Sequence, residues 1–404
     1  MIGFRSIGMA LGLLVASLLT ASAAETGDWQ EVLAKARGQT VYFNAWAGDT
    51  QTNDFIDWVG REAENRYGVS LRHVKLKDTA EAVTRVVAEK AAGREEGGSV
   101  DLIWINGPNF LTMKKQGLLF GPFASHLPNW RFVDIADKPS NLVDFTIPVD
   151  GYESPWRMAQ LVFVFHSART PLPSLPKSMK EMLGWATEHP GRLTHPDVRN
   201  FLGATFLKQA LYELADDPKL LQTPATEETF ATVTAPFWAW YDKLKPLLWQ
   251  GGNEFPNTGP AQKQLLSDNE IDIAISFNPS EAAVSIQNGT LPDTARVYVL
   301  DGGTIGNTSF VAIPFNAAHK EGAMVVANLL LEPEIQARAQ DPMTMGNFTV
   351  LDLDKLDAAQ RQLFERPADA VGLPTNAELG TALLEPDPSW MTRLVAEWQM
   401  RYVR

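Results

Sequence analysis

The sequence contains no cysteine among its 404 residues. This absence excludes a disulfide framework, thiol chemistry, iron–sulfur ligation and cysteine-based zinc sites. With 45% hydrophobic and 21% charged residues, the composition is that of an ordinary globular chain, and no low-complexity tract or repeat of fixed period is visible. The stability of the protein must therefore come from apolar burial in large cores.

The common signatures of catalysis and cofactor binding are also missing. The sequence has no G-x-S-x-G nucleophile elbow, no G-x-x-x-x-G-K-[ST] phosphate loop, no G-x-G-x-x-G fingerprint and no H-E-x-x-H zinc helix. Its 6 histidines are scattered without the spacing of metal ligands. These absences leave an enzyme unsupported without excluding one. We expect no catalytic residue, no metal site and no cofactor, and we expect a binding function rather than an enzymatic one.

Basic side chains are fewer than acidic ones in this sequence. The chain has 35 basic and 48 acidic side chains, a formal net charge of −13 at pH 7. Such a surface repels phosphate backbones, so nucleic acid is not expected as a partner. An acidic surface usually serves solubility, although a preference for cationic ligands is a second interpretation.

One apolar run stands at the beginning of the chain, and no later stretch of that length lacks charges. Arg5 precedes the apolar residues 7–19, and the small residues Ala21, Ser22 and Ala23 follow them. The run is too short for a bilayer, which needs about 20 residues, and the pattern is that of a secretory signal peptide. We expect cleavage after Ala23 or Ala24, so that residues 1–23 form the signal peptide and the mature protein works in a bacterial periplasm.

About 380 residues remain after this cleavage, which is too long for one core and predicts two domains. Apolar strands at 41–46, 69–75 and 100–105 alternate with helical patterns at 52–67 and from Asp78 onward. This β-α-β-α-β order is typical of a doubly wound α/β lobe whose strands are covered on both faces.

The same alternation resumes later in the chain and predicts a second α/β lobe. The expected elements are a short strand at 191–194, a helix at 202–214, a long helix at 230–249 interrupted near Pro236 and Pro246, a helical segment at 262–266 and a strand at 271–276. The strand-like residues 154–165 and 308–314 would connect the lobes. The expected division is residues 24–153 for the first part of lobe 1, 154–303 for lobe 2, 304–345 for the return crossover and second part of lobe 1, and 346–404 for a C-terminal helical segment.

Candidate ligand residues follow the predicted strands, because ligands of open α/β sheets bind beyond the carboxyl ends of the strands. Tryptophan rings would supply an aromatic surface, Asp49 one negative charge, and the amide and hydroxyl groups hydrogen bonds. Gly203 near a helix start would permit close backbone approach. The predicted site consists of Trp46, Asp49, Asn106, Asn109, Trp156, Asn200, Gly203, Asn278, Thr304 and Asn307.

Each of these residues also has a purely structural interpretation. Asparagine and glycine are common turn formers, and tryptophan is a common core residue. A secreted hydrolase that uses Glu153, which is close to Trp156 in sequence, or Asp197 stays open as an alternative, but no partner carboxylate can be identified. A periplasmic chaperone that holds peptides in the cleft is a third hypothesis.

Five segments, in this order and spacing, resemble a known family. They are residues 41–46, 100–107, 115–119, 270–274 and 308–314. The chain is similar to periplasmic solute-binding proteins of extracellular solute-binding family 1, in the group that contains thiamine-binding and spermidine/putrescine-binding proteins, and within it to the YnjB-like subgroup. The resemblance covers nearly the whole mature chain.

The resemblance implies a fold, a partner and a solute class. The fold would be the two-lobed type II periplasmic binding fold, α/β, each lobe a mixed, mostly parallel sheet flanked by helices, with a ligand cleft between the lobes. The protein would work as a monomer, close on a small-molecule solute and deliver it to an inner-membrane ABC permease. The chain has no adjacent tyrosine pair, which disfavours ferric iron, and few acidic loop residues, which disfavours a linear polyamine. A compact cationic or zwitterionic solute, thiamine-like in size, fits better, with a sugar or polyol as the alternative.

Overall fold

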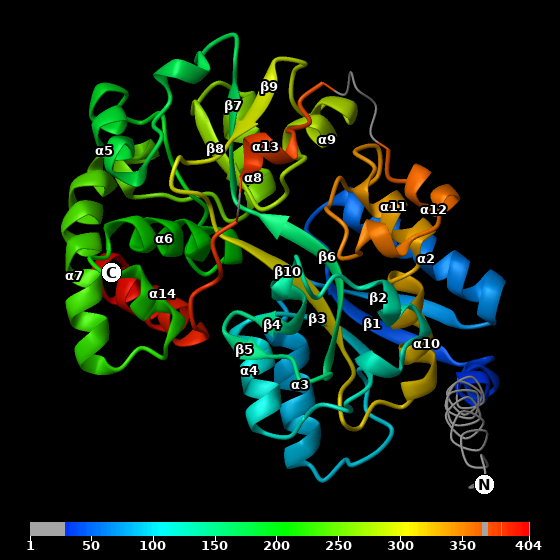
Figure 1. The fold of residues 1–404 in the computed structure, drawn as a ribbon. Coiled ribbons are helices and arrows are strands. Elements are labelled where there is room, and N and C mark those ends of the chain that lie inside the picture. The colour runs from blue at the N-terminus through cyan, green and yellow to red at the C-terminus, as the bar shows by residue number, and fades with distance from the viewer. Residues whose placement is uncertain (1–28, 366–370, 381, 404) are drawn as a thin grey trace, which may run out of the picture.

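The protein folds into two α/β lobes (Figure 1). The structure is a computed structural model and describes residues 29–365, 371–380 and 382–403, with the side chain of residue 376 left out. The predicted signal peptide, residues 1–23, lies outside the described residues. We call the five-stranded sheet with its helices lobe 1 and the three-stranded sheet with its helices lobe 2.

Lobe 1 is built on a mixed sheet with the strand order β2-β1-β3-β10-β6. The strands β1 and β2 are parallel, as are β1 and β3, whereas β10 is antiparallel to both β3 and β6. The three predicted strands at the start of the chain are present. The bounds are β1 Thr40–Trp46, β2 Ser70–Leu76, β3 Leu102–Ile105, β6 Glu153–Gln160 and β10 Gly306–Ala312.

Helices cover both faces of this sheet, as the continuous apolar strands predicted. One core joins α2, α10 and α11 to β1, and a second joins α3 and α4 to β3. A small hairpin of β4 and β5 lies beside α4 (Figure 1). The bounds are α2 Thr50–Tyr67, α3 Ala80–Ala91, α4 Pro108–Lys115, β4 Val143–Asp144, β5 Ile147–Pro148, α10 Lys320–Leu330 and α11 Pro333–Gln340.

Lobe 2 contains a sheet with the order β8-β7-β9, in which both strand pairs are antiparallel rather than mostly parallel as expected. The central strand β7 enters directly from β6, so its direction is set by lobe 1. The predicted strand at 191–194 is reduced to one parallel bridge between Leu193 and Ile273. The bounds are β7 Val162–His166, β8 Ile273–Ser276, β9 Ala295–Tyr298, α5 Met179–Glu188, α6 Phe201–Leu214, α7 Glu227–Leu244, α8 Gly259–Ser267 and α9 Glu281–Gln287.

The helix α7 continues through Pro236, so the expected interruption there is wrong. Its second half buries Phe237, Trp238, Trp240 and Tyr241 in the largest apolar cluster of lobe 2, and this packing holds the helix together. The predicted break near Pro246 is present, because α7 ends at Leu244 and a 3₁₀ helix follows at Lys245–Leu247.

Among the described residues, three parts of the chain connect the lobes. The strand β6 runs through Leu161 into β7, and residues 299–305 lead from β9 to β10. The third passage is the C-terminal segment, which pairs at Phe348 with Met158 of β6 and ends in a helix packed in the lobe 2 core (Figure 1). Within the described residues of this segment, helices are present at α12 Ala358–Gln362, α13 Asn376–Leu379 and α14 Pro388–Tyr402. The division expected from the sequence stays a proposal, with one change: because lobe 1 is defined by its sheet, β6 belongs to lobe 1, and lobe 2 begins after Gln160 rather than at residue 154.

Candidate functional site

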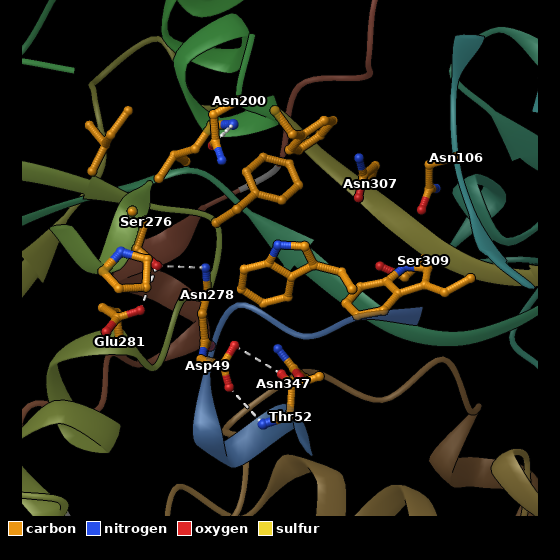
Figure 2. A pocket seen from close by; sticks show the side chains of 18 of the residues that line it. Asp49, Thr52, Asn106, Asn200, Ser276, Asn278, Glu281, Asn307, Ser309 and Asn347 are labelled. Carbon is orange, nitrogen blue, oxygen red and sulfur yellow. Dashed lines mark hydrogen bonds between the residues drawn. The ribbon is translucent and has the colours of Figure 1, made fainter. Parts of the chain in front are cut away.

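A cavity of about 400 Å³ lies between the two lobes. Lobe 1 lines it with residues that follow β1 and β3 and with residues of β6 and β10, and lobe 2 lines it with residues at the end of β8 and at the start of α6. Figure 2 shows Asn200 and Asn278 on one side of this space and Asn106, Asn307 and Ser309 on the other. The cavity therefore offers polar groups from both lobes to one bound molecule.

Seven of the ten predicted residues line this cavity. They meet there because the carboxyl ends of β1, β3 and β8 face the gap between the lobes, as expected for open α/β sheets. The seven are Trp46, Asp49, Asn106, Asn109, Asn200, Asn278 and Asn307.

Several of these side chains also stabilise the backbone. Asp49 caps α2 by accepting hydrogen bonds from the backbone N–H (2.6 Å) and the hydroxyl (3.0 Å) of Thr52. Asn200 caps α6 in the same way through the backbone N–H of Leu202. Asn278 donates to the carbonyl of Met345 at 2.7 Å. These side chains therefore have a structural role and line the cavity at the same time. Their hydrogen bonds to the backbone fix the orientation of their polar groups.

The other three predicted residues do not reach the cavity. Trp156 is 1% exposed and stacks on Phe55 in the lobe 1 core. Thr304 is buried at a passage between the lobes, where its hydroxyl accepts a hydrogen bond from Gln160 at 3.1 Å. Gly203 does permit close backbone approach, but of the protein's own carbonyls at 196 and 197, which a Cβ would meet. The expected aromatic platform at Trp156 is therefore corrected to a core position.

Arg157, the neighbour of Trp156 on β6, is a cavity residue that the sequence pattern did not predict. Arg157 lines the cavity together with Ser309 and Asn347. The alternation of side chains along a strand was the available signal, because it places Arg157 away from a core residue at the preceding position. The same alternation along β10 could have identified Ser309. The position of Asn347 at the cavity depends on a tertiary contact and could not be predicted in this way.

Arg157 is held over aromatic rings. Its guanidinium carbon lies 4.2 Å from the ring centroid of Trp104 and 5.1 Å from that of Trp156. The guanidinium donates to Asn347 Oδ1 at 3.0 Å and to Ser309 Oγ at 3.4 Å. Burial lowers the pKa of Arg157 to about 10, while Asp49 opposes this shift. The group therefore stays positively charged at neutral pH.

Aromatic rings line the cavity from both lobes. On the lobe 1 side Trp46 and Trp104 pack edge to face with ring centroids 6.3 Å apart. On the lobe 2 side Phe201 and Phe277 pack in the same manner at 5.3 Å. A planar or apolar part of a ligand would find ring surface on either side.

On the lobe 2 side of the cavity, the charge of Glu281 is neutralised by neighbouring side chains. Glu281 forms an ion pair with Lys263 at 2.8 Å and accepts hydrogen bonds from the hydroxyls of Ser276 and Ser285, each at 2.7 Å. Burial alone would raise the pKa of Glu281, but Lys263 and these hydrogen bonds outweigh it and lower the pKa. The cluster therefore presents dipoles rather than net charge to the cavity.

Neither of the two carboxylates considered for a hydrolase, Glu153 or Asp197, lines the cavity. Glu153 is fully buried, lies outside the cavity lining and has no hydrogen-bond partner for either carboxylate oxygen among the described residues. Burial raises its pKa well above the usual value, and Asp144 adds to the shift. Asp197 forms an ion pair with Arg199 at 2.7 Å and is also outside the lining. In the described ranges no group of three acidic or histidine side chains is placed to hold a metal ion.

The part of the chain that the structure describes has no helix of the length and apolar character needed to span a bilayer.

Comparisons with known proteins agree with this architecture. The family model of the bacterial extracellular solute-binding proteins matches residues 58–352. The chain is 42% identical over 400 residues to Protein YnjB of Escherichia coli (strain K12), covering 98% of this chain and 99% of that protein.

Solved structures of low sequence identity share the fold. The spermidine/putrescine ABC transporter substrate-binding protein PotD from Streptococcus pneumoniae aligns with a TM-score of 0.58 and 15% identity over 90% of this chain and 98% of that chain. The periplasmic binding protein AfuA from Actinobacillus pleuropneumoniae, solved with fructose-6-phosphate, aligns with a TM-score of 0.61 and 12% identity, with the same coverage of 90% and 98%. These likenesses confirm the type II periplasmic binding fold.

The members of the matched family are solute-binding proteins rather than enzymes, and the cavity between two lobes is the feature that such a function requires. The chain therefore belongs to the bacterial extracellular solute-binding protein family, as the periplasmic solute-binding component of an ABC importer.

Proposed function

We propose that this protein binds one compact organic solute, thiamine-like in size, in the cavity between the lobes, and delivers it to the permease by closing on it. The observation that carries the proposal is the lining of the cavity by both lobes. A ligand that contacts both sides stabilises the closed state over the open one, and the closed shape is what a permease would recognise. A volume of about 400 Å³ lies in the range of pockets for small organic molecules.

The lining favours a cationic or zwitterionic solute, and a zwitterion above all. Aromatic surface from Trp46 and Trp104, with Asp49 beside it, suits a cationic or aromatic part of the ligand. Arg157 suits an anionic part of the same ligand. A linear polyamine fits poorly, because the carboxylate of Glu281 is paired with Lys263 and that of Asp49 is engaged by Thr52.

A sugar or polyol is the second candidate. The amides of Asn106, Asn278 and Asn307 line the cavity together with the rings. Amide groups and aromatic faces are a combination that also suits neutral hydroxyl-rich ligands. This candidate predicts that neutral sugars or polyols bind without any contribution from the charged side chains.

Native mass spectrometry of the freshly purified protein tests the proposal. We expect a co-purified solute of defined mass, which release under denaturing conditions and tandem mass spectrometry would identify. A thermal-shift screen against a metabolite library should give one sharp response that grows as RT ln(1 + [L]/Kd). Broad, weak shifts with many peptides would favour the chaperone hypothesis, and turnover of a responding compound would contradict a pure binding function.

We further infer that the mature protein is a periplasmic monomer from which residues 1–23 have been removed. Intact-mass measurement of the protein from a periplasmic extract would show cleavage after Ala23 or Ala24, and light scattering after size exclusion would give the mass of one chain. A retained leader or a stable dimer would contradict these two inferences without touching the binding proposal.

A further inference from the structure

We infer that the cavity contains a subsite for an oxyanion, a carboxylate or phosphate group of the solute, formed by Arg157, Ser309 and Asn347. The inference rests on the proposed function, because it names the chemistry that one end of the bound solute carries. We call these three residues the anion subsite.

The register of the lobe 1 sheet brings the three residues together. Arg157 on β6 lies opposite Ser309 on β10. An adjacent antiparallel bridge pairs Met158 with Phe348, which places Asn347 opposite Ala159, two residues along β6 from Arg157, and the long side chain of Arg157 reaches the amide oxygen of Asn347 at 3.0 Å. The β6–β10 pairing shifts register between Ser309 and Phe310, a bulge of the kind that redirects side chains next to binding sites. The anion subsite is thus built on paired strands and is preorganised.

The donors of the anion subsite are only partly used. A guanidinium carries five N–H groups. Among the described residues, Arg157 donates through Nε to Ser309 and through Nη1 to Asn347, which leaves three N–H groups without a protein acceptor. Because the hydroxyl oxygen of Ser309 and the amide oxygen of Asn347 accept from Arg157, the Ser309 O–H and the Asn347 N–H₂ remain to donate. A planar or tetrahedral oxyanion would accept from several of these donors.

Arg157 has no ion-pair partner among the described residues, although Asp49, which lines the same cavity, attracts it from a longer distance and raises its pKa. No carboxylate of the described residues lies within 4.0 Å of its nitrogens, the distance that defines the ion pairs of this protein. The ring of Trp104 stabilises the cation but does not neutralise it. A half-buried guanidinium that faces the cavity and contacts no carboxylate in the described part of the chain is a favourable partner for an anionic ligand group.

The other cations around the cavity differ from Arg157. Lys263 is paired with Glu281, and Arg199 is paired with Asp197 and has a side chain that is 70% exposed. Lys77 is exposed to solvent. Arg157 is therefore the half-buried cation of the described lining that has no carboxylate within 4.0 Å.

Titration with simple anions tests the subsite. Inorganic phosphate and sodium acetate would be added to the ligand-free protein, with sodium chloride added at equal ionic strength as the reference. Tryptophan fluorescence would report binding, because the guanidinium lies on the ring of Trp104. We expect saturable binding of phosphate to the native protein, at least tenfold weaker binding to Arg157→Gln, and intermediate binding to Arg157→Lys, which keeps the charge but loses the planar fork.

Two further variants keep the test decisive. Arg94→Gln removes one positive charge from an exposed site outside the cavity and should bind phosphate like the native protein. Asn347→Asp places a carboxylate next to Arg157 and should abolish phosphate binding while the fold is kept, which covers the case that Arg157→Gln does not fold. Circular dichroism and the melting temperature would be checked for every variant.

The subsite would be refuted if neither anion bound the native protein up to 100 mM, or if both bound Arg157→Gln or Asn347→Asp as tightly as the native protein. A co-purified solute without an anionic group would also refute the subsite, and would leave the proposed solute-binding function intact. Conversely, failure to find any solute would contradict the proposed function while the phosphate titration still reported on the subsite.

Discussion

The buried ion pair between Lys208 and Glu385 connects three parts of the protein. Lys208 belongs to α6 and Glu385 to the C-terminal segment, and Asn307 of β10 donates to the same carboxylate at 3.0 Å. The Lys208 Nζ to Glu385 Oε2 distance is 2.6 Å, and the side chains are 0% and 2% exposed. Burial lowers the pKa of Lys208 and raises that of Glu385, and the attraction between the two charges opposes both shifts.

Replacement of one partner leaves the other charge buried without its counter-ion, because the nearby carboxyl of Asp144, whose pKa burial raises to about 8, is mostly protonated at neutral pH. We expect Lys208→Met to lower the free energy of unfolding by about 3–5 kcal/mol, the usual cost of breaking a buried pair. For a chain of about 380 residues the unfolding entropy is about 0.8 kcal/mol/K, so this loss corresponds to a fall in melting temperature of about 4–6 °C. Glu385→Gln should destabilise the protein as well, whereas Lys208→Met/Glu385→Leu should recover most of the loss because no unpaired charge remains.

Urea unfolding followed by tryptophan fluorescence, together with calorimetry, would compare the native protein, both single variants and the double variant. The cycle isolates the coupling energy between the two side chains. If each single variant lost less than about 1 kcal/mol, the value of an exposed pair, the assumption that the pair is shielded from water would be refuted. Losses in the double variant equal to the sum of the single losses would refute the coupling.

Three further predictions follow from the same structure. Trp156→Ala should lower the free energy of unfolding by about 3–5 kcal/mol, because it removes a core ring. Trp46→Ala should instead cost about 1–3 kcal/mol of solute affinity, with a smaller effect on the free energy of unfolding. Chemical unfolding and calorimetric titration of both variants separate the two roles, and the reverse pattern would contradict the assignment. The raised pKa of Glu153 means that the unfolded state releases a proton above about pH 4.3 which the folded state keeps, so stability falls as pH rises, by up to about 1.4 kcal/mol per pH unit. Glu153→Gln should reduce this slope above about pH 4.3, while Asp144, whose pKa burial raises to about 8, keeps a slope of the same sign. A slope of melting temperature against pH that Glu153→Gln leaves unchanged would contradict the contribution of Glu153. Saturating solute should reduce the radius of gyration in small-angle X-ray scattering while circular dichroism stays constant, and scattering curves that do not change on binding would count against closure of the lobes.

The pattern of apolar segments was sufficient to predict the first three strands of lobe 1 and the helices between them. Continuous apolar runs at 41–46 and 100–105 are typical of strands covered on both faces, and the structure places both in the lobe 1 sheet. Because ligands bind beyond the carboxyl ends of such strands, the same pattern also identified Trp46, Asn106 and Asn278 as cavity residues. Both features follow from the order of apolar and polar residues within short segments, which the sequence shows directly.

Tertiary structure decided the features that depend on contacts between distant segments. The sequence does not state which face of β6 meets the core, and the pairing with β10 places Trp156 in the core and Arg157 at the cavity. The antiparallel sheet of lobe 2 and the return of α14 to that lobe likewise follow from the path of the chain between the lobes. Tertiary structure also decided the charge of the cavity. Folding brings the carboxylate of Glu281 to Lys263 and neutralises it, whereas folding places no carboxylate of the described residues at ion-pair distance from Arg157.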